Sequence, residues 1–363
     1  MNFQEFENFL RQAREFNASD IHLTVGAPTV IRVNGELSKF GEINPEDVNR
    51  TILSLMNAEQ EKLVSEGKDV DFGFELSDGT RQRVNVFRQS GKLAASIRLL
   101  NTEIPTLEKL KMPSVLLDFA RKRCGLVLVT GPTGAGKSTT LASLIDYINE
   151  TRACHIITIE DPIEYKYTQK RATIHQREVG RDVETFGDAL RSALREDPDV
   201  ILIGELRDYE TISLALTAAE TGHLVLGTLH TASAAQTIDR IIDAGPVHAQ
   251  EQTRGQLANL IQGIVAQTLI PTADGKGRIA ATEVMIGTDA VRNLIRSNKV
   301  PLLESTMQSG KTRGMCTMND SIAKLYQSGI IDYDNAIDYS TDKADMEKKI
   351  MPPPGTPRRN AMI

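Results

Sequence analysis

The sequence predicts an α/β fold in two parts, a small α+β domain followed by a parallel sheet with helices on both faces. Between residues 125 and 230, nearly continuous apolar segments such as "GLVLVT", "HIITIE" and "VILI" alternate with helical patterns, as strands buried on both faces do. A glycine-rich loop follows the first of these strands. At 363 residues the chain is also too long for one ordinary core.

The first part, residues 1–100, begins with an amphipathic helix and continues with short strands and turns. Strands are expected at "DIHLTV", "TVIRVNG", "VDFGFEL", "RQRVNVFRQ" and "KLAASIRLL", and helices after Pro45 and Ala58. The segment 101–114, "NTEIPTLEKLKMPS", is polar, carries two prolines and breaks the strand pattern. It is therefore predicted to be a linker.

The second part, residues 115–340, contains the alternating strands and helices. A helix is expected from about Lys137 to Asn149, and beyond Ala232 the chain is predicted to be mostly helical. The last segment, 341–363, is polar and includes "MPPPGTPRRN". We predict that this tail is disordered.

The composition narrows the class of protein. The formal charge of -6, from 42 basic and 48 acidic residues, argues against a general nucleic-acid binder. The apolar runs are far shorter than a membrane span, and the N-terminus lacks the features of a signal peptide. The three cysteines form no CxxC pair, which fits a reducing compartment. A cytoplasmic protein is expected.

The loop "GPTGAGKST" matches the G-x-x-x-x-G-K-[ST] phosphate-binding motif between a strand and a helix. Its glycines allow backbone N–H groups to surround a polyphosphate, Lys137 reaches the β- and γ-phosphates, and Ser138 ligates Mg²⁺. ATP and Mg²⁺ are therefore the expected ligands. The predicted nucleotide-binding residues of the loop are Gly131, Pro132, Thr133, Gly134, Ala135, Gly136, Lys137, Ser138 and Thr139.

Carboxylates follow two strands of the same predicted sheet. Glu160, Asp161 and Glu164 lie in "HIITIEDPIEY", and Glu205 follows "VILIG". Parallel strands bring them to the edge that carries the phosphate loop, where carboxylates hold the waters of the metal and orient the attacking water. Without that loop, a plain turn with solvated glutamates would be the better interpretation. Gly204 stands where an aspartate is usual, so Glu205 acts through water or another carboxylate contacts the metal. Which glutamate is the base stays open.

Two histidines and two arginines give weaker signals. His223 and His230 bracket the strand "LVLGTL"; a zinc pair is not expected from them, and His230 is placed to sense the γ-phosphate. A core histidine is the alternative. Arg83 and Arg98 lie on strands of the first part. Exposed, solvated heads are the simpler interpretation, and charge supplied to a neighbouring ATP site is the functional one.

Several motifs together resemble the type IV pilus retraction ATPases (PilT family) of the secretion ATPase superfamily. They are "VTGPTGAGKSTTLASLID", "ITIEDPIEY", "QREVG", "REDPDVILIGELRD", "TAAETGHLVLGTLHTASAAQTIDRIID" and "AVRNLIRS", in an order that covers about residues 5 to 340. The resemblance implies a hexameric ring of subunits, each with a PAS-like N-terminal domain and a RecA-like ATPase domain. ATP would lie between these domains, near the adjoining subunit.

The resemblance also assigns roles to residues. Glu164 resembles the catalytic base, Glu205 the atypical Walker B glutamate near the metal, and Glu160 is a further acidic residue beside the nucleotide. His223 and His230 resemble the paired histidines of the family, and Arg83 and Arg98 the arginines that complete the site. Ala135 replaces a serine of the family loop, a harmless change because backbone groups bind the phosphates.

The segment "AVRNLIR" resembles a motif associated with retraction. Val291, Leu294 and Ile295 are predicted to form an apolar stripe. Arg292 and Arg296, four residues apart, form a second stripe beside it, which leaves two guanidinium groups for a partner or a neighbouring subunit. Residues predicted to couple the motor to a partner are Arg292, Asn293, Leu294 and Arg296. The implied partner is the inner-membrane platform protein at the pilus base, and an ordinary amphipathic helix is the alternative. Ser297 departs from the family, which has an acidic residue there.

The expected function is an ATP-hydrolysing motor ring that drives pilus retraction from the cytoplasmic face of the inner membrane. An accessory retraction ATPase is an alternative and a further candidate partner. A pilus or type II secretion assembly ATPase is the other close alternative, although the chain lacks its paired CxxC motifs. A nucleic-acid translocase is disfavoured because no basic stripe with interleaved aromatic residues is present.

Overall fold

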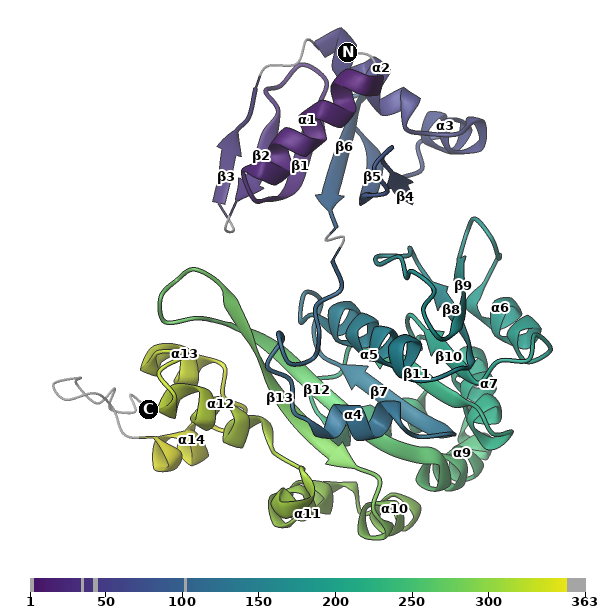
Figure 1. The fold of residues 1–363 in the computed structure, drawn as a ribbon, viewed down its shortest axis with the longest axis vertical. Helices are drawn as coiled ribbons and strands as arrows, with labels where there is room; N and C mark the ends of the chain where they lie inside the picture. The colour runs from purple at the N-terminus through teal and green to yellow at the C-terminus, as the bar shows by residue number, and fades with distance from the viewer. Residues whose placement is uncertain (1–2, 34–35, 42–44, 101–102, 351–363) are drawn as a thin grey trace, which may run out of the picture. The chain divides into compact units, whose positions relative to one another are not determined.

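The computed structural model describes residues 3–33, 36–41, 45–100 and 103–350. They form two compact units, drawn in Figure 1. The first unit comprises Met1–Ile104 together with the short segment Pro162–Lys166, and the second comprises Pro105–Asp161 and Tyr167–Ile363. The boundary near residue 104 agrees with the predicted change of pattern, whereas the return of the chain to the first unit at Pro162 has no counterpart in the prediction.

The first unit is an antiparallel sheet in the strand order β3-β2-β1-β6-β5-β4 with three helices. Phe6 and Leu10 of α1 are buried one helical turn apart and share a core with Ile21, Ile52 and Ile97. The elements are α1 (Phe3–Glu15), β1 (Ala18–Thr24), β2 (Val30–Val33), β3 (Glu36–Lys39), α2 (Pro45–Ser54), α3 (Ala58–Ser65), β4 (Val70–Glu75), β5 (Arg81–Gln89) and β6 (Lys92–Leu99).

The second unit is built on a sheet in the strand order β13-β12-β7-β11-β10-β8-β9. All neighbours pair in parallel except β12 and β13, which form an antiparallel hairpin. Its strands are β7 (Gly125–Thr130), β8 (His155–Glu160), β9 (Thr173–Glu178), β10 (Val200–Ile203), β11 (Leu224–Leu229), β12 (Ile261–Pro271) and β13 (Arg278–Ile286). The predicted parallel sheet is confirmed.

Helices cover both faces of this sheet, as Figure 1 shows. In β7, Leu126 and Leu128 face a core shared with α6–α10, while Val127 and Val129 face a second core shared with α4 and α5. Complete burial of side chains of this size contributes about 1.5–3 kcal/mol each. The helices are α4 (Val115–Ala120), α5 (Lys137–Thr151), α6 (Phe186–Ala193), α7 (Tyr209–Glu220), α8 (Ala234–Asp243), α9 (Val247–Leu260) and α10 (Asp289–Arg296).

The prediction of a mostly helical chain beyond Ala232 is wrong for residues 261–286, which form the β12–β13 hairpin. Short apolar runs do not distinguish a strand from a helix by periodicity alone. The segment "PTADGKG" between the two strands carries turn residues that mark the connection. This hairpin extends the parallel sheet beside β7, next to the phosphate loop.

The predictions for the linker and the tail need correction. Residues 105–114 belong to the second unit, where Leu107 and Met112 are buried; residues 101–102 lie outside the described part. Within the predicted tail, α14 is an ordered helix whose Met346 is buried, and residues 351–363 lie outside the described part. The remaining helices are α11 (Leu303–Ser309), α12 (Met318–Gln327), α13 (Tyr333–Asp338) and α14 (Lys343–Lys349). None of the described helices has the length and apolar character needed to cross a membrane.

Candidate nucleotide site

The phosphate loop runs from the carboxyl end of β7 to the first turn of α5. Its shape requires glycine at two positions in particular. Gly131 has φ 143°, and a Cβ there would lie 2.2 Å from the carbonyl oxygen of Gln267. Gly136, with φ 85°, directly precedes α5, so the chain enters the helix from the left-handed region that glycine tolerates. The loop and its helix therefore form as the motif predicts.

Lys137 is held inside this loop rather than in solvent. Its side chain is buried, and Nζ donates to the carbonyl oxygens of Gly131 at 2.8 Å and Pro132 at 3.0 Å. Ser138 is exposed at the beginning of α5. The ammonium group is thus pre-positioned within the loop, where a phosphate oxygen would be a stronger acceptor than a neutral carbonyl.

Gln267 of β12 supports the phosphate loop through two hydrogen bonds. It is 1% exposed, its Nε2 donates to the carbonyl of Ala135 at 2.6 Å, and its Oε1 accepts from the Thr140 hydroxyl at 3.0 Å. Sequence analysis missed this residue because it lies in the segment predicted to be helical. The two hydrogen bonds link the loop and α5 to the neighbouring strand.

His230 connects Lys137 to Glu205. It follows the carboxyl end of β11, with Nδ1 3.5 Å from Lys137 Nζ and Nε2 3.2 Å from Glu205 Oε1. One imidazole ring thus lies within reach of both the ammonium group and the carboxylate. The predicted placement of His230 and Glu205 beside the phosphate loop therefore has a direct geometric basis.

Arg207, two residues after Glu205, is a partner that sequence analysis overlooked. Its Nη2 lies 2.7 Å from Glu205 Oε2. Burial opposes ionisation of Glu205, but the hydrogen bond and charge of Arg207, followed by His230, outweigh it and lower the pKa of the carboxyl. Gly204 packs closely on the β8 backbone, where a Cβ would lie 3.2 Å from the carbonyl of Ile159. A larger side chain there would require the β8 backbone to shift by a few tenths of an ångström.

The predicted acidic cluster is divided between the two units. Glu160 lies at the carboxyl end of β8 and accepts from the Thr158 hydroxyl at 2.6 Å and from Gln176 Nε2 at 3.3 Å. Glu164 lies in Pro162–Lys166, which folds with the first unit; within that unit Lys166 forms an ion pair with Glu75. The place of Glu164 beside the phosphate loop therefore stays a prediction.

His223 lies at the opposite end of β11 from His230. Its Nδ1 is 2.8 Å from the carbonyl of Ala218 and 3.1 Å from the Thr221 hydroxyl, and its own carbonyl accepts from Gly125, where β7 begins. The phosphate loop is at the other end of β7. Contact between His223 and a nucleotide in the same chain's loop is therefore not supported by this geometry.

Arg83 and Arg98 are direct partners across the β5–β6 ladder. Arg83 grips Asp71 through Nε and Nη2, at 3.0 and 2.6 Å from the same carboxylate oxygen, and Arg98 Nε donates to Asp20 at 2.9 Å. The side chains remain 38% and 59% exposed. Both arginines are therefore exposed, as the simpler interpretation has it, but each is paired with a carboxylate. Their role toward a neighbouring ATP site stays a prediction.

Helix α10 has the predicted apolar stripe, with Val291 and Ile295 fully buried and Leu294 partly buried. Its arginines differ from the prediction of two free guanidinium groups. Arg292 Nη2 donates to the carbonyl of Ile261 at 3.3 Å, and Arg296 Nη2 donates to Asn259 at 2.7 Å. Both groups thus reach the C-terminal end of α9, where positive charge is favoured by the helix dipole. Asn293 is exposed beside them.

Comparisons with known proteins identify the family of this chain. The family described as "Type II/IV secretion system protein" matches residues 4–337. The type IV pilus retraction ATPase PilT of Pseudomonas aeruginosa is 48% identical over 321 residues, covering 88% of this chain and 93% of PilT. The type IV pilus ATPase PilU of the same bacterium is 40% identical over 348 residues, covering 95% of this chain and 91% of PilU.

Among solved structures, the pilus retraction motor PilT with bound ADP superposes with a TM-score of 0.87 and 47% identity, covering 96% of this chain and 99% of that one. This likeness confirms the predicted α/β class with an N-terminal domain and a RecA-like ATPase domain. The family model, the identity to PilT and the structural likeness together show that the chain belongs to the PilT family of secretion ATPases.

Proposed function

We propose that this chain hydrolyses ATP at the loop Gly131–Thr139 and uses the free energy to drive type IV pilus retraction. The observation that carries the proposal is the line of contacts from Lys137 through His230 to Glu205. These contacts connect the ammonium group of Lys137 to the ionised carboxylate of Glu205, which follows β10. Retraction is supported by the likeness to PilT over nearly its whole length.

Lys137 and the backbone N–H groups of the loop would bind the phosphates. Since a phosphate attracts the ammonium more strongly than the carbonyls of Gly131 and Pro132 do, nucleotide binding would draw Nζ away from them. That shift would also change the contact between Lys137 and His230. The contact between His230 and Glu205 would thereby depend on whether a phosphate is bound.

The residues present fit Mg²⁺. Ser138 offers an exposed hydroxyl at the start of α5, and Arg207 helps to keep Glu205 ionised, so the donors are oxygen atoms of the kind this ion prefers. Among the described residues no three His, Cys, Asp or Glu side chains converge on one point, so Ser138, Glu205 through water and the phosphates of ATP would hold the ion. When bound, Mg²⁺ neutralises charge on the phosphates.

Glu164 is proposed as the base that orients the attacking water, and Glu160 as a second acidic residue near the nucleotide. Arg83 and Arg98 are proposed to supply positive charge to the phosphates, which guanidinium groups bind through two hydrogen bonds. To do so they must exchange Asp71 and Asp20 for phosphate. The assignments of Glu164, Arg83 and Arg98 rest on the family resemblance, and that of Glu160 rests on its position at the carboxyl end of β8.

We further propose that the chain assembles into a homo-hexamer at the cytoplasmic face of the inner membrane. Helix α10, with Arg292, Asn293, Leu294 and Arg296, is the proposed contact to the platform protein of the pilus. Arg296 is the better candidate for this contact, because it is exposed while Arg292 is half-buried. An accessory role is the main alternative, because the likeness extends to PilU over an even larger share of this chain.

Two substitutions test the hydrolytic site. Lys137→Ala should weaken binding of a fluorescent ATP analogue by about tenfold to a hundredfold, because a hydrogen bond to a charged group contributes roughly 1.5–3 kcal/mol. Glu164→Gln keeps the size of the side chain, so the analogue should still bind while phosphate release collapses. Turnover near that of the unmodified protein in Glu164→Gln would move the base role to Glu160 or Glu205.

Gene deletion tests the biological task. Loss of a retraction motor should leave cells without twitching but with more surface pili, whereas loss of an assembly ATPase should leave cells without pili. An accessory motor should give a partial defect that disappears at low load. Complementation with Lys137→Ala checks that the phenotype depends on the nucleotide site, because this variant should not restore motility.

A further inference from the structure

A cavity of about 590 Å³ opens in the second unit, between the hairpin strand β13 and the helices α12 and α14. Its volume is in the range that binds small organic molecules, roughly 300–1,000 Å³. The lining includes residues from the segment before α4, so parts of the chain far apart in sequence converge on it. The phosphate loop contributes no residue to the lining.

The lining is strongly basic. It contains four lysines and one carboxylate, and hence an excess of three positive charges; these residues are Lys111, Lys311, Lys324, Lys349 and Asp320. Like charges brought together around a cavity repel one another, and the repulsion is relieved when an anion occupies it. The charge therefore indicates what kind of ligand the cavity favours.

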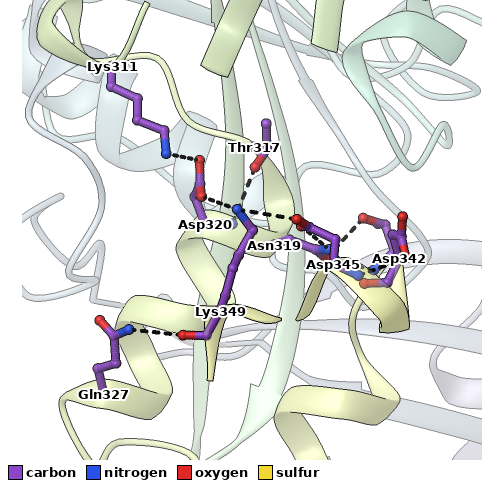
Figure 2. A network of polar contacts seen from close by, with 9 residues as sticks. Lys311, Thr317, Asn319, Asp320, Gln327, Asp342, Asp345 and Lys349 are labelled. Carbon is purple, nitrogen blue, oxygen red and sulfur yellow. Dashed lines mark hydrogen bonds and ion pairs between the residues drawn. The ribbon is translucent and has the colours of Figure 1, made fainter. Parts of the chain in front are cut away.

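Two carboxylates already neutralise part of this charge, Asp320 in the lining and Asp345 beside it. Asp320 is 8% exposed, with Lys349 Nζ at 3.0 Å from Oδ1 and Lys311 Nζ at 2.8 Å from Oδ2. Figure 2 shows Asp320 between the two lysines, with Asn319 and Asp345 beside Lys349. The network fixes both ammonium groups at the wall of the cavity, so little side-chain entropy remains to be lost when they bind an anion.

The other two lysines make no ion pair within the described part of the chain. Lys111 and Lys324 are both exposed, and Lys111 has a left-handed backbone, φ 54°, which is uncommon for a lysine. The lining also includes the apolar side chains of Met315, Ala323 and Leu325. The cavity thus combines apolar side chains with two ammonium groups that have no carboxylate partner within the described part of the chain.

We propose that this cavity binds a soluble, phosphorylated small molecule. Phosphate groups would contact Lys111 and Lys324, because Lys311 and Lys349 are already paired with Asp320 and Asp345. The organic part would pack on the apolar side chains of the lining. Lysine binds phosphate well as a compact point charge. The site is separate from the phosphate loop, and the inference does not rest on hydrolysis there.

The test uses inorganic triphosphate as the probe and isothermal calorimetry as the measurement. The full chain carries Lys137→Ala, so that binding at the phosphate loop is weakened. In this background we expect one triphosphate per chain at the cavity. Adding Lys111→Gln and Lys324→Gln should lower the affinity at least about tenfold, because each lysine contributes a charge-assisted hydrogen bond.

A charge-matched control keeps the result specific. Lys109 and Lys343 are exposed lysines that do not line the cavity, so Lys109→Gln with Lys343→Gln should leave the affinity within about twofold. Equal losses in both double variants would mean a general effect of charge and would overturn the proposal. So would binding that is insensitive to Lys111 and Lys324. Unchanged melting temperatures in both variants show that the fold is retained.

A second arm separates a soluble ligand from a lipid headgroup. Vesicles containing phosphatidylglycerol present phosphate on a surface, and their binding is followed by co-sedimentation with the same variants. Binding of triphosphate that depends on Lys111 and Lys324 supports the cavity as a small-molecule site. If only vesicles bind in a manner that depends on these lysines, the cavity is part of a membrane contact and the proposal is wrong.

Discussion

Gln267 offers the sharpest test of how the phosphate loop is held in place. Gln267→Leu keeps a side chain of similar size but removes both hydrogen bonds, to the carbonyl of Ala135 and from the hydroxyl of Thr140. Ala135 and Thr140 are each 2% exposed, so water cannot readily replace the lost partner. A buried polar group left without a partner costs about 1–3 kcal/mol. The two losses together should destabilise the second unit by about 2–6 kcal/mol.

Urea denaturation would measure the free energy of unfolding, and a fluorescent ATP analogue would measure the affinity of the loop. We expect the free energy of unfolding and the affinity both to fall, because the loop loses the two hydrogen bonds that hold it on β12. Thr140→Val is the matched control, since it removes only one of the two hydrogen bonds and should have about half the effect on stability. In a double-mutant cycle the two substitutions should be clearly non-additive. Unchanged stability and unchanged affinity in Gln267→Leu would refute the idea that β12 supports the loop.

Three further predictions concern charged side chains. Arg83→Ala should reduce turnover at saturating ATP while light scattering shows unchanged assembly; unchanged turnover would contradict a role of Arg83 at the nucleotide. Arg296→Ala should preserve stability and most ATPase activity but abolish twitching. Arg292→Ala loses a half-buried contact to the end of α9 and should also lower the melting temperature. Equal effects of Arg296→Ala on ATPase activity and motility would contradict a coupling role. Because the folded-state pKa of Glu205 is lowered from its usual 4.5, its ionised form adds stability above that pH, and this contribution is lost as the pH falls through the folded pKa. Glu205→Gln should therefore flatten the loss of stability with acid, and an unchanged acid limb in urea denaturation at several pH values would count against the paired carboxylate.

Local patterns in the sequence determine the core of this protein well. The phosphate loop, the strands β7, β8, β10 and β11 and the helix after the loop were all predicted, because each depends on residues adjacent in sequence. A glycine at a left-handed position indicates a turn, and an unbroken run of β-branched residues indicates a buried strand, whatever the rest of the chain does. Glu205 and His230 could be placed beside the loop for a related reason, since the carboxyl ends of parallel strands meet at one edge.

Tertiary structure alone decided how those parts are supported. Nothing in the sequence around Gln267 indicates that its amide group hydrogen-bonds a loop more than a hundred residues earlier. The apolar run around Gln267 also does not distinguish a strand from a helix. The arginines of α10 have the spacing of a free charged stripe, yet the end of α9 lies within their reach. Likewise, the segment Pro162–Lys166 lies shortly after the end of β8 but folds with the first unit. In each case the deciding contact joins segments distant in sequence, and the free energy of such a contact depends on where the chain brings them together.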